Sequence, residues 1–251
     1  MERYQEIERS IIKKFRKQLW RPFIRGIQDY DLIQEGDKIA VCISGGKDSM
    51  LLAKLLQELK RHGKFPFEMV FLVMNPGYNP ANRQRIIDNA KILNVPITMF
   101  ESEIFDAVVN IEDSPCYLCA RMRRGYLYSK AKELGCNKIA LGHHFDDAVE
   151  TFLMSLFYEG RIGCFEPVTY LSRSGVTQIR PMLYIGEKAI EHFAQAQQLP
   201  VVRNVCPADK HTKRQEIKEL IASLQTQYPD IKTRIFGAMQ RYPLSQWSVQ
   251  K

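Results

Sequence analysis

The sequence predicts an α/β protein with a doubly wound, mostly parallel sheet of five strands and helical extensions at its N- and C-terminal ends. Two observations support this prediction. Short apolar runs alternate with helical patterns along the chain, and these runs are continuous, as in strands that are buried on both faces. With 251 residues and a hydrophobic content of 45%, the chain is also long enough to enclose a full core.

The overall composition limits the class of protein. No apolar run approaches the length of a membrane span, and the N-terminus lacks the apolar region of a signal peptide, so we expect a cytoplasmic protein with no membrane partner. In that reducing compartment, the six cysteines should be thiols or metal ligands rather than disulfides. The formal net charge of +8 suits a polyanionic partner.

The positive charge is concentrated at the N-terminus. Residues 1–25 hold eight Lys or Arg and three Glu, which gives +5 of the total of +8. Apolar residues recur at helical spacing from Glu2 to Trp20, so we expect one amphipathic helix that Pro22 ends. Such a helix can be a solvated lid on the core or an arm that binds RNA. Its basic face carries Lys13, Lys14 and Lys17.

A predicted strand, glycine loop and helix between Lys38 and His62 form the stretch around which the chain is arranged. In the loop, SGGKDS, two glycines allow a tight turn, while free N–H groups and the positive end of the helix dipole converge on one anion site. It is not a Walker A loop, because Lys47 is followed by Asp48. That Asp should repel phosphate unless it caps the helix or binds Mg²⁺. The residues expected to contact phosphates are Ser44, Gly45, Gly46, Lys47, Asp48 and Ser49.

The next strands are predicted at 67–74 and 97–100, with a helix at 81–93 between them. Ligands of parallel sheets bind at the carboxyl ends of the strands. Met74 is therefore expected beside the glycine loop.

A CxxC pair, Cys116 and Cys119, precedes a predicted helix that runs to Leu134. Two such cysteines can share a metal or form a redox disulfide, and they supply only half of a tetrahedral metal site. The same helix carries three arginines that are candidates for RNA contacts, Arg121, Arg123 and Arg124. The remaining cysteines before the last strand are expected to be ordinary buried thiols: Cys42, Cys136 and Cys164.

A further strand at 138–141 leads into Gly142, His143 and Asp147. Gly142 permits close approach of a nucleotide, and the carboxylates after it can bind Mg²⁺ or position a ligand. The alternative interpretation is that these acidic residues cap a helix start and that His143 has a structural role.

The C-terminal part is predicted to hold a hairpin, a helix, a short strand at 201–202 and two more helices. The hairpin covers 168–170 and 176–179, and the helices cover 187–198, about 211–225 and 229–241. Arg180, at the end of the hairpin, can clamp a phosphate, although a surface salt bridge is the ordinary role of a lone Arg.

The loop SGGKDS resembles the pyrophosphate loop of the PP-loop ATP pyrophosphatase superfamily, whose members split ATP between its α- and β-phosphates and adenylate an oxygen that a nucleophile then replaces. Together with PCYLCxRxRRGxLY, IALGHHxDDxxETFLxxxFYxG, IRPMLY and Cys206, the chain resembles the tRNA 2-thiocytidine synthetases over residues 36–225. We therefore expect three parts. These are a basic N-terminal helical arm (1–30), a PP-loop ATPase domain (31–205) and a C-terminal helical extension that carries Cys206 (206–251).

The resemblance implies ATP, Mg²⁺ and a 4Fe-4S cluster as cofactors. It assigns the cluster to Cys116, Cys119 and Cys206, which leaves one iron open to carry sulfur to cytidine 32 of a tRNA. It makes these cysteines and Asp48 the catalytic residues, with Asp48 as a Mg²⁺ ligand. The ATP contacts it implies are Ser44 to Ser49, Met74, Gly142, His143, Asp147 and Arg180. The implied partners are tRNA and a sulfur donor such as a cysteine desulfurase, and a homodimer is compatible with the sequence.

Other functions stay open at this point. One is a PP-loop thiolase or ligase for a different tRNA nucleotide or a small molecule, with zinc or no metal at the cysteines. Another is a nonenzymatic RNA-binding module that uses ATP as a structural ligand.

Overall fold

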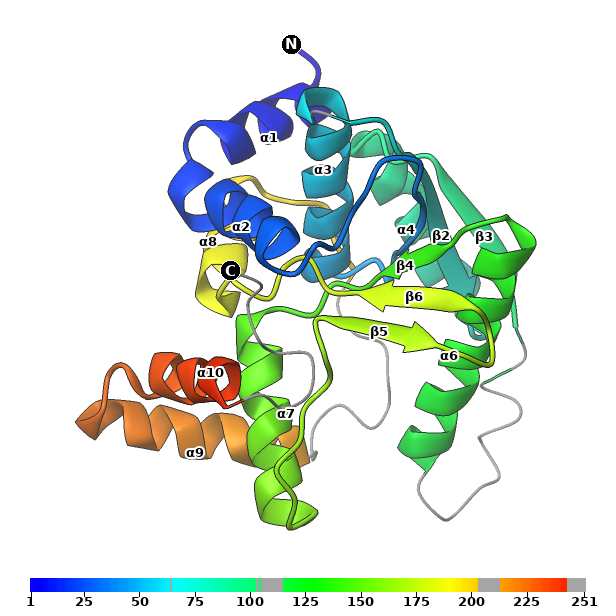
Figure 1. Ribbon diagram of the computed structural model, residues 1–251. Coiled ribbons are helices and arrows are strands. Elements are labelled where there is room, and N and C mark those ends of the chain that lie inside the picture. The colour runs from blue at the N-terminus through cyan, green and yellow to red at the C-terminus, as the bar shows by residue number, and fades with distance from the viewer. Residues whose placement is uncertain (64, 103, 105–114, 203–212, 243–251) are drawn as a thin grey trace.

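The computed structural model describes residues 1–63, 65–102, 104, 115–202 and 213–242, except for the side chains of 115–120. Its sheet has six strands in the order β3-β2-β1-β4-β6-β5, and only β5 is antiparallel to its neighbour (Figure 1). The strands are β1 (Lys38–Cys42), β2 (Glu68–Asn75), β3 (Ile97–Glu101), β4 (Lys138–Ala140), β5 (Val168–Leu171) and β6 (Val176–Ile179). The predicted fold class is confirmed, and the sheet has six strands rather than five because both hairpin strands join its edge.

Strand β1 lies at the centre of the sheet. Val41 pairs with Phe71 of β2 on one side and with Ala140 of β4 on the other, both in parallel register. The carboxyl ends of these three strands therefore lie at one edge of the sheet, and the loops that follow them start next to one another.

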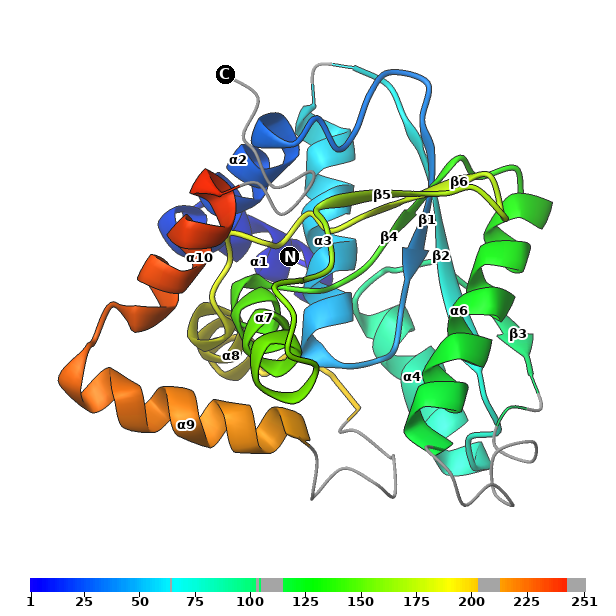
Figure 2. The same ribbon diagram turned by 60° about the horizontal axis from the view of Figure 1, so that its bottom comes forward.

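Helices cover both faces of the sheet, as Figure 2 shows for α3 (Lys47–His62) and α6 (Pro115–Glu133). α3, α4 (Pro80–Ile92) and α8 (Glu187–Ala196) pack against the sheet in the largest hydrophobic core, which includes Ile39 and Val41. Helix α6 packs on the opposite face with Ala40. A third hydrophobic cluster joins α7 (Phe145–Tyr158), α9 (Lys213–Gln227) and α10 (Ile231–Arg241).

The N-terminal segment consists of three helical pieces, α1 (Arg3–Ile12), the π-helix η1 (Arg16–Trp20) and α2 (Arg21–Asp29). The prediction of one helix that Pro22 ends is wrong. Pro22 instead lies in the first turn of α2, where its missing N–H costs no helical hydrogen bond. The apolar face of these pieces is part of the largest core, through Ile7, Ile11, Phe15, Leu19 and Phe23.

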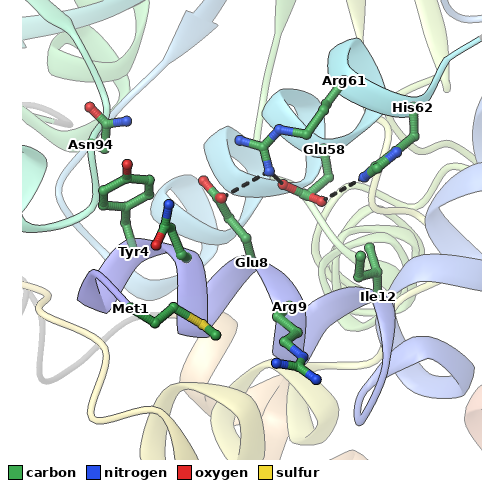
Figure 3. Close-up of a pocket in the computed structure, with 10 residues that line it drawn as sticks. Met1, Tyr4, Glu8, Arg9, Ile12, Glu58, Arg61, His62 and Asn94 are labelled. Carbon is green, nitrogen blue, oxygen red and sulfur yellow. Dashed lines mark hydrogen bonds and ion pairs between the residues drawn. The ribbon is translucent and has the colours of Figure 1, made fainter.

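Buried charges fasten α1 to α3. Glu8 Oε1 lies 2.5 Å from the Nζ of Lys54, whose side chain is fully buried and which also donates to the Leu93 carbonyl at 2.8 Å. Arg61 bridges Glu8 at 2.9 Å and Glu58 at 2.5 Å, as Figure 3 shows. Because a buried charge is costly without its partner, this network holds the N-terminal segment on the core.

Two further observations complete the fold. The predicted strand at 201–202 is wrong, because Val202 instead donates its N–H to the carbonyl of Gly45 at 2.9 Å. None of the helices within the described ranges is long and apolar enough to cross a membrane.

Candidate nucleotide-binding site

The glycine loop turns between β1 and α3 at Gly45, whose backbone conformation only glycine adopts without strain. Gly45 has a φ of +84°, and a Cβ there would lie 3.0 Å from Cγ1 of Ile86 in α4. Its carbonyl receives the Val202 N–H. The loop is therefore wedged between α4 and the chain that follows α8.

The two serines of the loop hold its shape. Ser49 Oγ accepts a hydrogen bond from the Ser44 N–H at 3.1 Å and donates one to the Gly46 carbonyl at 3.0 Å. Ser44 Oγ lies 3.1 Å from Ser49 Oγ. These hydroxyls thus fix the turn that presents the first N–H groups of α3, in addition to any contact with an anion.

The loop after β4 forms the second wall of the site. A Cβ on Gly142 would lie 3.4 Å from the Asp48 carbonyl carbon and from the Ser49 nitrogen, so this glycine allows two backbone segments to approach closely. A pocket of about 410 Å³ lies between the walls. It is lined by the predicted residues Ser44, Asp48, Ser49, Met74, Gly142, His143 and Asp147.

Four predicted nucleotide contacts do not line this pocket: Gly45, Gly46, Lys47 and Arg180. Lys47 Nζ lies 3.4 Å from Glu187 in α8 and 3.3 Å from the neighbouring carboxylate of Asp48. Arg180 is buried, donates to Gln178 Oε1 at 2.8 Å, and lies with its guanidinium carbon 4.7 Å from the centre of the Phe165 ring. Burial lowers the pKa of Arg180 to about 10, so it remains charged near neutral pH.

The two adjacent histidines have different roles. His143 lines the pocket, stacks on Phe165 with ring centres 4.9 Å apart, and has a buried Nδ1 with no hydrogen-bond partner among the described residues. Burial, with the nearby positive charge of Arg180, lowers its pKa to about 4, so the imidazole is neutral near pH 7. His144 is a structural residue: its Nδ1 accepts the N–H of Asp147 at 3.4 Å, and it caps α7.

Asp48 carries an oxygen that lacks a hydrogen-bond partner. Its Oδ1 is buried and accepts no hydrogen bond from the described residues, although it lies 3.3 Å from Lys47 Nζ and the pocket reaches this side chain. No group of three or more possible ligands for a metal occurs in the described part of the chain. Mg²⁺ usually takes one or two carboxylates and completes its coordination with substrate phosphates and water. The donor set at Asp48 fits an ion of that kind.

Basic residues of the C-terminal helices contact the acidic side of the site, and sequence reasoning missed them. Arg214 lies 3.0 Å from the buried Glu150 and 3.6 Å from Asp147. Lys218 lies 3.1 Å from Glu187, the partner of Lys47. Burial raises the pKa of Glu150 although both cations oppose that shift. A buried carboxylate needs a partner, but the sequence does not say which distant cation provides it.

The predicted metal-binding cysteines can be placed only in part. Cys116 and Cys119 lie in the first turns of α6, and their side chains are outside the described residues, as is all of Cys206. The other cysteines are free thiols, and burial raises the pKa of Cys42 and of Cys164 to about 12. Both residues are half-buried, and their thiols are protonated near neutral pH, as expected of structural cysteines.

The predicted RNA-contacting residues lie in different places. Arg123 lines the nucleotide pocket and donates to the Tyr78 hydroxyl at 3.2 Å. Arg121 and Arg124, on the same helix, are exposed outside that pocket. Lys13, Lys14 and Lys17 are exposed on the N-terminal segment.

Comparisons with known proteins agree with this architecture. The PP-loop domain family model matches residues 8–224. The tRNA-cytidine(32) 2-sulfurtransferase of Syntrophotalea carbinolica is 38% identical over 221 residues, which cover 86% of this chain and 85% of that protein. The enzyme of the same name from Teredinibacter turnerae is 38% identical and covers 93% of this chain and 78% of its own. A solved structure of the U34-tRNA thiolase NcsA from Methanococcus maripaludis, with its 4Fe-4S cluster, superposes with a TM-score of 0.72 at 22% identity, covering 88% of this chain and 78% of that one. At that identity, the likeness shows a common fold.

Proposed function

Because the chain belongs to the PP-loop family that includes the tRNA-cytidine(32) 2-sulfurtransferases, we propose that it is an ATP-dependent tRNA sulfurtransferase. In the proposed reaction, O2 of cytidine 32 attacks the α-phosphorus of ATP and pyrophosphate leaves. A sulfur nucleophile then attacks C2 of the base, and the former O2 leaves with AMP. The product is 2-thiocytidine.

The pocket between the glycine loop and Gly142 is the observation that carries this proposal. It joins seven of the residues expected to contact ATP in one cavity at the carboxyl edge of the sheet. The N–H groups at the start of α3 would stabilise the charge that develops on pyrophosphate, because they are already oriented by the serine hydrogen bonds. Asp48 would hold Mg²⁺ against the phosphates through Oδ1, which accepts no hydrogen bond from the described residues and has Lys47 Nζ 3.3 Å away.

Apart from Arg123, the remaining walls of the pocket suit an uncharged base better than a phosphate. Met74 and Leu127 are apolar, and His143 is neutral near pH 7. We assign this part of the pocket to the adenine or to the cytosine that is modified. Lys47 and Arg180 would not contact ATP in the arrangement described, since each is held by other side chains.

The cysteines would hold a 4Fe-4S cluster, and two features of the backbone support this. Positions 116 and 119 belong to the first turns of α6, the helix whose Arg123 lines the nucleotide pocket one to two turns later. The segment with Cys206 is flanked by Val202, bonded to Gly45, and by Arg214, bonded to Glu150. When bound through three cysteines, such a cluster supplies an iron that is open to an external sulfur. A donor such as a cysteine desulfurase would deliver that sulfur.

Anaerobic purification tests the assignment of the cysteines. We expect a brown protein with about four irons per chain, and a loss of iron and of visible absorbance in Cys206→Ser. Cys164→Ser, at a half-buried thiol that donates to the Ala148 carbonyl, is the matched control and should keep the cluster. A colourless protein that does not take up iron and sulfide would rule out the cluster and favour a ligase or a zinc site. Release of AMP and pyrophosphate, measured with and without tRNA, separates an enzyme from a protein that only binds ATP.

A further inference from the structure

One face of α6 and the tip of the β5–β6 hairpin enclose a groove of about 660 Å³, which we call the α6–hairpin groove. Arg121, Arg124, Tyr128 and Lys132 follow one another at helical spacing along α6 and form one wall. The residues from Tyr170 to Ser174 form the other wall. Figure 1 shows the hairpin tip beside α6 at the edge of the sheet.

The groove is positively charged and its charge is not compensated. Arg121, Arg124, Lys132 and Arg173 line it, and no Asp or Glu is among its described lining residues. Among the described residues, none of these four cations forms an ion pair, whereas exposed cations elsewhere do, such as Arg234 with Asp230 at 2.8 Å. All four are exposed. Four unpaired cations along one groove favour a bound polyanion.

An exposed aromatic residue at the groove indicates which polyanion it is. Tyr170 lies on the edge strand β5 with 65% of its surface exposed, although burial would favour a large aromatic side chain. Aromatic rings beside cations are the usual platform for unstacked bases of single-stranded RNA. An acidic peptide would use the cations but would gain little from this ring.

The Arg121 end of the groove lies on the side of the nucleotide pocket, whereas the hairpin tip lies at the amino ends of β4 and β6, at the other edge of the sheet. Arg123 and Leu127 line that pocket from the adjacent face of α6. Arg121 and Arg124 of the groove therefore lie on either side of Arg123 in the chain. From residue 121 to residue 132 the helix rises about 16 Å, enough for several consecutive phosphates. A strand bound along the groove would therefore place the nucleotide beyond its Arg121 end near the pocket, with Tyr170 contacting a base further along the strand.

We propose that the α6–hairpin groove binds the single-stranded loop of the tRNA substrate next to the modified nucleotide, with a base stacked on Tyr170. This inference rests on the proposed function for the identity of the RNA. The cations would contact the phosphates, and the tyrosine would contact the base. The sequence alone indicated two of these arginines but not the hairpin, because the two walls are about 40 residues apart in the chain.

Binding of a fluorescent, unmodified tRNA with cytidine at position 32, followed by anisotropy at several salt concentrations, tests the groove. Lys132→Ala with Arg173→Ala should weaken binding and lower the slope of log K against log salt by roughly 0.7 to 0.9 for each lost phosphate contact. Tyr170→Ala should weaken binding about tenfold with little change in that slope, and Tyr170→Phe should restore it. Lys91 is an exposed lysine at the C-terminal end of α4, outside the groove. Lys91→Ala is therefore the control and should bind tRNA as the wild type does.

The outcomes separate this inference from the proposed function. Unchanged tRNA affinity in the double variant and in Tyr170→Ala would overturn the groove, even if the wild-type protein thiolates tRNA. The same affinity for polyglutamate as for tRNA, with no effect of Tyr170→Ala, would also overturn it in favour of an acidic protein partner. Loss of tRNA binding in these variants would support the groove, even if the wild-type protein forms no thiolated nucleoside. ATP binding measured without RNA should stay unchanged, which shows that the variants are folded.

Discussion

Replacing Gly45 by Ala tests the conformation of the glycine loop. At a φ of +84° an alanine costs about 1–2 kcal/mol relative to glycine. Its Cβ would also lie 3.0 Å from Cγ1 of Ile86, and that crowding adds about 1 kcal/mol or more because Ile86 is buried against the core. We therefore expect Gly45→Ala to lower the free energy of unfolding by about 2–4 kcal/mol and to weaken ATP binding.

The neighbouring glycine provides the matched control. Gly46 has a φ of −77°, which any residue adopts, and a Cβ there would meet only Ser44 Oγ at 3.5 Å. Gly46→Ala should stay within about 1 kcal/mol of the wild type, because the loss of a glycine N-cap and the lower entropy of the unfolded chain oppose each other. Urea unfolding measures both values. Equal stability of Gly45→Ala and Gly46→Ala, whether both are destabilised or neither is, would refute the left-handed turn at Gly45.

Three further predictions concern charged groups. Asp48→Asn should raise the Mg²⁺ concentration needed for ATP binding at least tenfold, with unchanged stability, and an unchanged Mg²⁺ requirement would exclude Asp48 as its ligand. The pKa of His143 is lowered from 6.5 to about 4, so the unfolded state binds more protons than the folded state between these pH values. The free energy of unfolding should therefore fall by up to about 3 kcal/mol as pH drops from 6.5 to 4. In His143→Asn it should fall by much less. Lys54→Ala should destabilise the fold by about 3–5 kcal/mol because it leaves Glu8 buried without its partner, whereas exposed Lys60→Ala should cost less than about 0.5 kcal/mol in the same urea assay.

The part of the site that the sequence predicts is the part that depends on local spacing. The SGGKDS loop is six adjacent residues between a strand and a helix, and Gly142 follows a parallel strand, so topology alone brings them to one edge of the sheet. Pro22 shows the limit of such patterns, because a proline is compatible with the end of one helix and with the first turn of the next. Which of the two helices Pro22 belongs to depends on how the helices pack.

The parts that could not be predicted depend on which distant side chains meet. Lys47 is held by Glu187, and Glu150 by Arg214 and Lys218, across large separations in the chain. Helical periodicity shows that Glu150 is on a buried face but does not identify the cation that pairs with it. Arg123 was predicted to contact RNA and lies in the nucleotide pocket because its turn of α6 faces the strand ends, a rotation that charge alone does not reveal.

Analysis of the nucleosides of tRNA by mass spectrometry tests the proposed function most directly. The anaerobically purified protein would be incubated with unmodified tRNA, ATP, Mg²⁺ and a sulfide source, and the tRNA digested. The account predicts one 2-thiocytidine per tRNA, formed at position 32 with one AMP for each sulfur, and none without ATP. AMP formation without a thiolated nucleoside, or sulfur at a different base, would contradict it.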